Sequence, residues 1–143
     1  MKKIINGKRY DTETATEVGY WKNMGDARDF HYECETLYRK RGGEYFLHGE
    51  GGAMTRYSQS YGTNEWGFGE RIMPLTHEEA RQWAEEHLEA DEYEAEFGEA
   101  PEDDERATVY AIVSAEAKRK LERMALEQGK TQAEVLESII TAA

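Results

Sequence analysis

Hydrophobic and polar residues alternate along the first half of the chain in the pattern that β-strands require. Near the start, Asn6-Gly7 separates two short runs and is a strong signal for a β-hairpin. Residues 30–40 alternate most regularly and predict a half-buried strand. The face predicted to be buried carries Phe30, Tyr32, Cys34, Thr36 and Tyr38. Shorter strands are predicted over residues 44–48, 54–57 and 71–75, with an aromatic loop over residues 58–69.

Two segments of the same region carry helical signals. Asp11 and Thr12 are good N-cap residues and predict a short helix to about Trp21. Thr76 and Glu79 have the spacing of a capping box and predict a longer helix. Apolar residues at helical spacing predict that this helix packs on the sheet: Ala80, Trp83, Ala84 and Leu88, with Tyr93 and Phe97 continuing the contact.

The C-terminal part has its own pattern. Ala107 to Val113 is a β-prone run, and Ser114 can cap a helix that ends at Gly129. Thr131 and Glu134 form a second capping box. The apolar stripes of the two helices are Ala117, Leu121, Met124 and Ala125, then Val135, Leu136, Ile139 and Ile140. Because about 37 residues cannot bury such stripes alone, the pattern predicts a homodimer.

These elements predict an α+β protein in which a small antiparallel sheet carries a packed acidic helix. The N-terminal domain is expected over residues 1–98, an acidic linker over residues 99–106, and a dimerisation unit over residues 107–143. The chain has 143 residues, a length that suits one domain with a small second unit.

The negative charge is concentrated in one segment. The whole chain has a net charge of -12, and residues 75–105 hold 14 Asp+Glu against one Arg, a net charge of -13. Such a block is either a solvated helix face or a surface that meets a basic partner. The candidate partner-binding residues on the predicted helix are Glu78, Glu85, Glu86 and Glu89.

The residues do not predict an enzyme, a metal site or a cofactor. His31 and Cys34 lie three apart on an alternating strand, so their side chains are expected on opposite faces. The single cysteine indicates a reducing, cytoplasmic setting. No secretory signal follows Met1, and no apolar run is long enough to span a membrane. The aromatic residues of segment 57–68 are expected in the core, with a binding patch as the alternative.

The C-terminal segment TVYAIVSAEAKRKLERMALEQGKTQAEVLESII resembles the ribbon-helix-helix fold of Arc-type repressors and antitoxins. The resemblance covers Thr108 to Ile140 and implies that two chains pair their strands into a ribbon. The implied dimer core is Val109, Ala111, Val113, Leu121, Ala125, Val135 and Ile139.

In that family the ribbon enters the DNA major groove, and the second helix binds a phosphate at its N-terminus. The DNA-binding residues implied here are Thr108, Tyr110, Ile112, Lys130 and Thr131. Ile112 offers no hydrogen-bonding group, and residues 106–143 have a net charge of only +1. The sequence therefore favours dimerisation over tight DNA binding.

The N-terminal segments KIINGKRYDTETATEV, YRKRGGEYFLHGEGG and GERIMPLTHEEARQWAEEHLEADEYEAEFGE resemble small proteins of prophages and mobile elements associated with anti-CRISPR candidates. This resemblance implies an inhibitor that binds a CRISPR effector, or another nucleic-acid-binding protein, through an acidic surface. The alternatives are a ribbon-helix-helix transcriptional regulator that binds operator DNA, and an antitoxin-like protein that masks a toxin.

Overall fold

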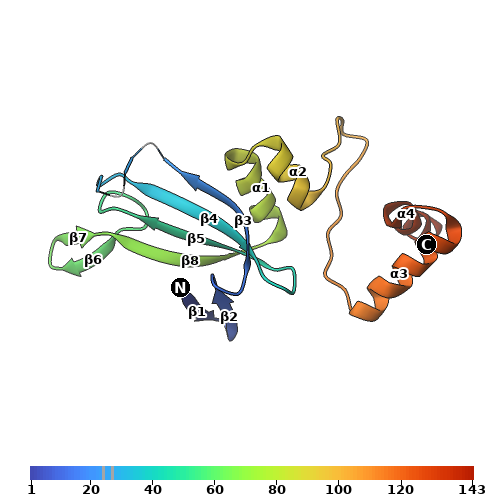
Figure 1. Ribbon diagram of the computed structural model, residues 1–143, viewed down its shortest axis with the longest axis horizontal. Coiled ribbons are helices and arrows are strands. Elements are labelled where there is room, and N and C mark those ends of the chain that lie inside the picture. The colour runs from blue at the N-terminus through green and yellow to red at the C-terminus, as the bar shows by residue number, and fades with distance from the viewer. Residues whose placement is uncertain (24, 27) are drawn as a thin grey trace. The chain divides into compact units, whose positions relative to one another are not determined.

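The structure is a computed structural model that describes residues 1–23, 25–26 and 28–143. The chain divides into two compact units, residues 1–108 and residues 109–143 (Figure 1). The strands are β1 (Lys2–Ile5), β2 (Lys8–Asp11), β3 (Thr16–Lys22), β4 (Glu33–Arg39), β5 (Tyr45–Gly51), β6 (Gln59–Gly62), β7 (Glu65–Gly67) and β8 (Gly69–Leu75). The helices are α1 (His77–His87), α2 (Ala90–Phe97), α3 (Ala115–Gln128) and α4 (Gln132–Ala142). The predicted α+β class is confirmed.

Strands β1 and β2 form the predicted N-terminal hairpin, with Ile5 opposite Lys8. Asn6 and Gly7 both have positive φ angles, of 51° and 78°. These angles are those of the tight turn that suits the twist of a two-residue hairpin. The local signal at Asn6-Gly7 was therefore sufficient to place this element.

Residues 16–22 form strand β3, so the predicted helix to Trp21 is wrong. The side chain of Asp11 does accept a hydrogen bond from the backbone of Glu13, but within a turn rather than at the start of a helix. Strand β3 pairs with β4 instead, from Thr16 opposite Arg39 to Lys22 opposite Cys34. This long-range pairing outweighs the local capping signal, in a segment rich in β-branched and aromatic residues.

The central sheet is antiparallel, with strand order β3-β4-β5-β8. Strand β4 begins at Glu33, later than the predicted start at Phe30, which lies in an exposed turn. The prediction that only one face of this strand is buried is also wrong. Leu37 is fully buried on one face, and Tyr38 stacks on Phe46 on the other, because the sheet is covered on both sides.

Helix α1 covers one face of the sheet, as its apolar stripe predicted. Its residues Ala80, Trp83 and Ala84 pack on the sheet residues Leu37, Tyr45 and Leu47. The β1–β2 hairpin covers part of the other face, where Tyr10, Phe46 and Ile72 form a second cluster. The main unit is therefore a sheet with helices on one side and a hairpin on the other (Figure 1).

Two further predictions for this unit are wrong. Residues 54–57 form turns rather than a strand, and segment 58–69 contains the β6–β7 hairpin rather than only a loop. Asn64 has a φ angle of 61° in the turn between the two short strands. This conformation is one that Asn tolerates better than most residues, which explains a hairpin without the usual Asn-Gly signal.

The turn over residues 53–57 places a tyrosine and an arginine over a buried acid. Glu35 is 1% exposed and accepts a hydrogen bond of 2.5 Å from the Tyr57 hydroxyl. Its other oxygen lies 2.7 Å from Nη2 of Arg56, an ion pair without hydrogen-bond geometry. Burial raises the pKa of Tyr57, and the hydrogen bond to Glu35 raises it further. This arrangement neutralises a carboxylate that would otherwise be costly to bury.

The second unit consists of α3 and α4 with the predicted ends. The Ser114 side chain accepts from the Ala117 amide, and Gly129 has a left-handed φ angle of 62°. Thr131 and Glu134 complete the predicted capping box of α4. Residues 107–113 are in neither a helix nor a strand, so the predicted strand is absent from the single chain. Among the described residues no β-strand lies beside this segment, and a strand requires a neighbouring strand.

No helix in the described part of the chain is long and apolar enough to cross a membrane.

Candidate partner-binding surfaces

The acidic surface begins on α1, whose capping box formed as predicted. The Thr76 side chain accepts from the Glu79 amide, and the Glu79 carboxylate accepts from the Thr76 amide. These hydrogen bonds hold the pKa of Glu79 below its ordinary value. Glu79 therefore has a structural role, and the remaining acids of α1 point to solvent.

The four acids predicted to bind a partner are all exposed, but their surroundings differ. Glu78 lies 2.6 Å from Nη2 of Arg81, so part of its charge is already paired. Glu85 and Glu86 are exposed on α1. Glu89 lies beyond the end of α1 and is the N-cap of α2, because the chain breaks the helix at Leu88. The single acidic helix expected from the sequence is therefore two helices.

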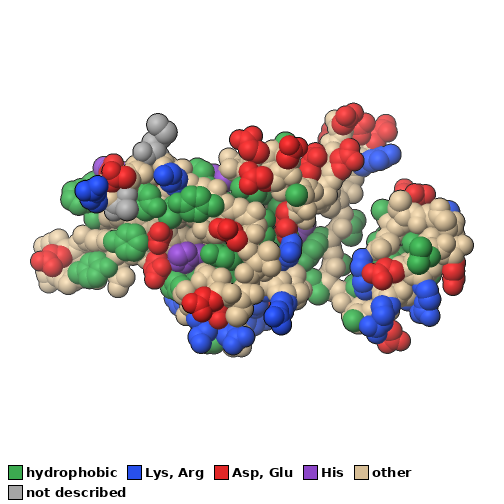
Figure 2. All heavy atoms as spheres, viewed as in Figure 1, with side chains coloured by type: hydrophobic (Ala, Val, Ile, Leu, Met, Phe, Trp, Pro, Cys, Tyr) green, Lys and Arg blue, Asp and Glu red, His purple; other side chains and the backbone are tan. Residues whose placement is uncertain are grey.

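More acidic residues extend this surface beyond the four predicted ones. The additional exposed acids are Asp91, Glu92, Glu94, Glu99, Glu102, Asp103, Asp104 and Glu105. Figure 2 shows the acidic side chains gathered over α1, α2 and the segment that follows them. We call the exposed acids of residues 78–105 the acidic surface. The charge of the segment could have identified them, since all belong to the stretch with a net charge of -13.

Glu96 is the exception on α2, because it is turned toward the sheet. Its carboxylate accepts hydrogen bonds from Arg39 at 2.5 Å and from the Tyr45 hydroxyl at 2.6 Å. Its side chain is only 12% exposed. The hydrogen bond to Glu96 raises the pKa of Arg39. This contact fixes α2 on the sheet and removes Glu96 from the acidic surface.

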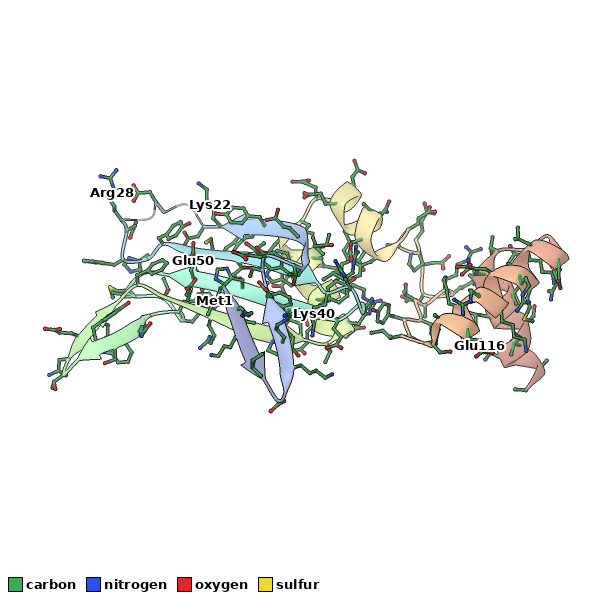
Figure 3. All side chains as sticks on the ribbon, turned by 60° about the horizontal axis from the view of Figure 1, so that its bottom comes forward. Met1, Lys22, Arg28, Lys40, Glu50 and Glu116 are labelled. Carbon is green, nitrogen blue, oxygen red and sulfur yellow. The ribbon has the colours of Figure 1, made fainter. Side chains whose placement is uncertain are left out.

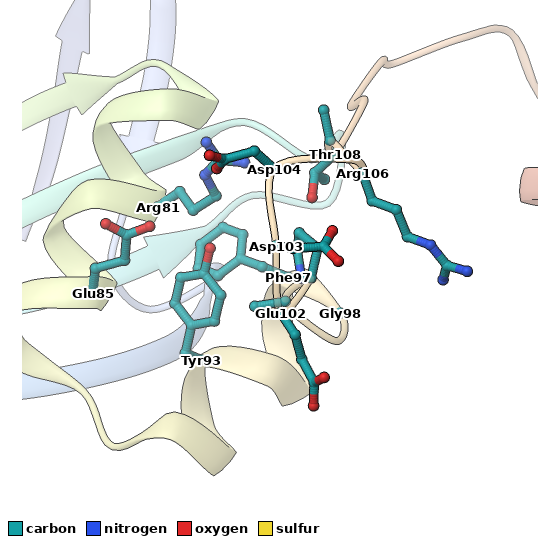
Figure 4. Close-up of a pocket in the computed structure, with 13 residues that line it drawn as sticks. Arg81, Glu85, Tyr93, Phe97, Gly98, Glu102, Asp103, Asp104, Arg106 and Thr108 are labelled. Atoms are coloured by element: carbon teal, nitrogen blue, oxygen red, sulfur yellow. The ribbon is translucent and has the colours of Figure 1, made fainter.

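A shallow hollow of about 440 Å³ lies within the acidic surface (Figure 4). Its aromatic wall is formed by Tyr93 and Phe97. Its charged lining consists of four acids and two arginines: Glu85, Glu102, Asp103, Asp104, Arg81 and Arg106. Burial raises the pKa of Tyr93. Because the carboxylates outnumber the two arginines and the wall is aromatic, the hollow suits a Lys or Arg side chain better than an anion.

The residues predicted to bind DNA are all exposed. Thr108 belongs to the first unit, whereas Tyr110 and Ile112 lie in the segment of the second unit that precedes α3. Lys130 and Thr131 are exposed at the start of α4. The Thr131 amide already donates to the Glu134 carboxylate at 3.4 Å. A phosphate at this position would have to displace that carboxylate.

The predicted dimer core is mostly uncovered. Ala125 and Val135 are buried between α3 and α4, and Leu121 is half-buried. The remaining predicted core residues are exposed: Val109, Ala111, Val113 and Ile139. Leu126, Leu136 and Ile140 add to this exposed apolar surface. Within the second unit, the two helices therefore bury little of their own hydrophobic area.

The aromatic segment divides between the core and the surface. Tyr57 is 3% exposed and belongs to the core. Tyr61, Trp66 and Phe68 are exposed on or beside the β6–β7 hairpin, against the expectation that they lie in the core. The hairpin carries them away from the main sheet, so they remain candidates for the binding patch considered as the alternative (Figure 1).

Comparison with known proteins gives no assignment: no family model, no curated protein and no solved structure matches this chain. The structure defines an α+β protein with a separate helical unit. The features that bear on its function are the acidic surface, the exposed apolar residues of the second unit and the aromatic hairpin.

Proposed function

We propose that this protein is a non-enzymatic inhibitor of the anti-CRISPR type, which binds a CRISPR effector or another nucleic-acid-binding protein. The observation that carries the proposal is the acidic surface on α1, α2 and residues 99–105. The segment containing it has a net charge of -13, and the rest of the chain sums to +1, because the total is -12.

Folding does not account for so many carboxylates in one place. Glu79 and Glu96 have structural roles, but most of the other acids in this segment are exposed. Exposed ionic groups contribute little to stability, and like charges within about 10 Å repel one another at moderate salt. A groove built to hold nucleic acid supplies the positive charge that would offset this repulsion.

Binding would act by occupying the site of the nucleic acid. Complementary charge speeds the encounter between two proteins and selects against wrong partners. The hollow beside Tyr93 and Phe97 offers a place for a basic side chain of the partner. This mechanism needs no reaction at the acidic surface, and the partner would be held by charge and by aromatic contact.

The second unit would serve as a dimerisation module of the ribbon-helix-helix kind. Its support is the exposed apolar residues of segment 109–113 and of α4. In a dimer the 109–113 segments would pair with each other, and each would give the other the neighbouring strand that a β-ribbon requires. Two acidic surfaces on one dimer would also strengthen binding to a partner with two sites.

A DNA-binding regulator or antitoxin-like protein is the second candidate. The observation that favours it is the α3–Gly129–α4 arrangement, with its helix caps and exposed Lys130. It predicts salt-sensitive binding of upstream DNA that Lys130→Ala weakens. The carboxylate of Glu134 already occupies the implied phosphate site, which weighs against DNA binding and so favours the inhibitor.

The proposal is tested by reversing charge where folding does not need it. The variant changes Glu85, Glu86, Glu94 and Glu102 to Lys. These residues are exposed and lie outside the capping boxes and outside the pairs made by Glu78 and Glu96. The control changes four exposed acids elsewhere, Glu13, Glu65, Glu122 and Glu127, to Lys.

Both variants carry the same net charge, so a difference between them reports on position. In pull-downs with a panel of purified CRISPR effectors, the parent and the control should bind one effector, and the acidic-surface variant should not. Raising the salt concentration should weaken the parent complex. Equal binding by the two variants would contradict the proposed surface, and the aromatic hairpin would then be the place to search.

A further inference from the structure

A mixed cluster of metal-binding side chains lies on the sheet face opposite the helices. The β1–β2 hairpin covers one part of this face, around Phe46. Farther along β5, His48 and Glu50 are two residues apart and therefore point to the same side as Phe46. Glu70 of β8 and Cys34 of β4 are the neighbours of Glu50 on either side. Figure 3 labels Glu50, which lies near the end of the inner strand β5.

The donor atoms of this cluster already lie close together. Nε2 of His48 is 2.9 Å from Oε2 of Glu70. One donor atom from each of His48, Glu50 and Glu70 lies within 4.8 Å of the other two. Donors around a tetrahedral Zn²⁺ ion are about 3.4 Å apart, because each lies about 2.1 Å from the metal. Small side-chain rotations would therefore bring all three to one ion.

The charges of the cluster also indicate a cation. Glu50 and Glu70 face each other directly across β5 and β8. Like charges at such cross-strand positions destabilise a sheet. The Cys34 thiol donates to Oε1 of Glu50 at 3.3 Å, which is a weak hydrogen bond and no positive charge. A divalent ion would offset both carboxylates.

We infer that His48, Glu50 and Glu70 bind a divalent transition-metal ion of the zinc class. One imidazole and two carboxylates form a donor set that suits Zn²⁺, and three protein ligands leave a position open for water or for a further ligand. Cys34 lies beside Glu50, 4% exposed, where it can support that carboxylate. The sequence predicted no metal site, because only the strand register brings His48 and Glu70 together from positions 22 residues apart.

The site is independent of the acidic surface, so the two proposals can fail separately. The experiment is calorimetric titration of ZnCl₂ into the full-length chain after treatment with a chelator. The parent should bind one Zn²⁺ per chain. His48→Ala and Glu70→Gln should each weaken this binding by at least about tenfold. Glu70 is an exposed residue, so Glu70→Gln keeps the test valid even if His48→Ala disturbs the fold.

Matched controls separate this site from the general attraction of an acidic protein for cations. His31→Ala removes a histidine whose side chain is 69% exposed, and Glu65→Gln removes an exposed carboxylate of the hairpin. The two control variants should bind Zn²⁺ as the parent does. Zn²⁺ should also raise the melting temperature of the parent and of the controls, but not that of His48→Ala or Glu70→Gln. Absence of binding by the parent would overturn the inference, and so would equal binding by the parent and Glu70→Gln. His48 and Glu70 would then be a hydrogen-bonded pair without a metal.

Discussion

Gly49→Ala should destabilise the main unit strongly, because a tyrosine ring occupies the space where the new methyl group would lie. A Cβ atom at Gly49 would be 2.0 Å from Cζ of Tyr57. No side-chain contact can be that short, so the ring of Tyr57 would have to leave its site. Tyr57 is 3% exposed, and its hydroxyl holds Glu35 by a 2.5 Å hydrogen bond.

The expected loss of stability follows from the lost burial of Tyr57 and from its lost hydrogen bond to Glu35. Exposing a large buried side chain costs about 1.5–3 kcal/mol. Losing a hydrogen bond to a charged group costs about 1.5–3 kcal/mol more. Because the chain will relax in part, we expect Gly49→Ala to lower the free energy of unfolding by about 3–5 kcal/mol, near the upper end for single substitutions.

Urea denaturation followed by tryptophan fluorescence measures this loss. Trp21, Trp66 and Trp83 all belong to the first unit, so the signal reports on that unit alone. Gly42→Ala is the control, because a Cβ atom there would have no neighbour within 4 Å and the φ angle is not positive. A loss below about 1 kcal/mol for Gly49→Ala, which is ordinary for any substitution, would refute this account of the Tyr57–Glu35 packing.

Three further predictions concern the acidic helix and the dimer. Thr76→Ala should lower the stability of the first unit by about 1 kcal/mol by removing the cap of α1. The pKa of Glu79 is lowered in the folded state, so its carboxylate contributes to stability at a pH above its ordinary pKa of 4.5. This contribution to stability is lost as the pH falls through the folded-state pKa. The stability difference between the parent and Glu79→Gln should therefore shrink with acidification, and a constant difference would contradict the capping role. Ile139 is 48% exposed in the single chain, and Ile139→Asp should give a monomer in analytical ultracentrifugation. The control Ala133→Asp, at an exposed position of the same helix, should remain a dimer. A monomeric parent would contradict the proposed dimer.

The sequence predicted best those features that depend on residues close together in the chain. The Asn6-Gly7 turn, the two capping boxes and the helix end at Gly129 all formed as expected. Each is decided by hydrogen bonds or φ angles within about one turn of backbone, so its residues carry the whole signal. The acidic surface was predicted for a similar reason, since its charge lies in one continuous segment.

The features that the sequence missed depend on distant partners. Strand β3 was predicted as a helix because its pairing with β4 is not visible in its own residues. Leu88, at the end of α1, packs closely on a strand that the sequence did not predict: a Cβ atom at Gly19 of β3 would lie 2.5 Å from Cδ2 of Leu88. The cluster of His48, Glu50 and Glu70 needs the register between β5 and β8, which alternation alone does not give.

Protection of target DNA from cleavage by a CRISPR effector tests the central claim most directly. The effector that binds the parent in the pull-down is loaded with guide RNA and mixed with its target DNA, with the parent, the acidic-surface variant or the control variant added. The account predicts protection by the parent and by the control, and cleavage in the presence of the variant changed at Glu85, Glu86, Glu94 and Glu102. Protection by that variant at the parent's concentration, with circular dichroism showing that all three proteins are folded, would contradict the claim that the acidic surface carries the function.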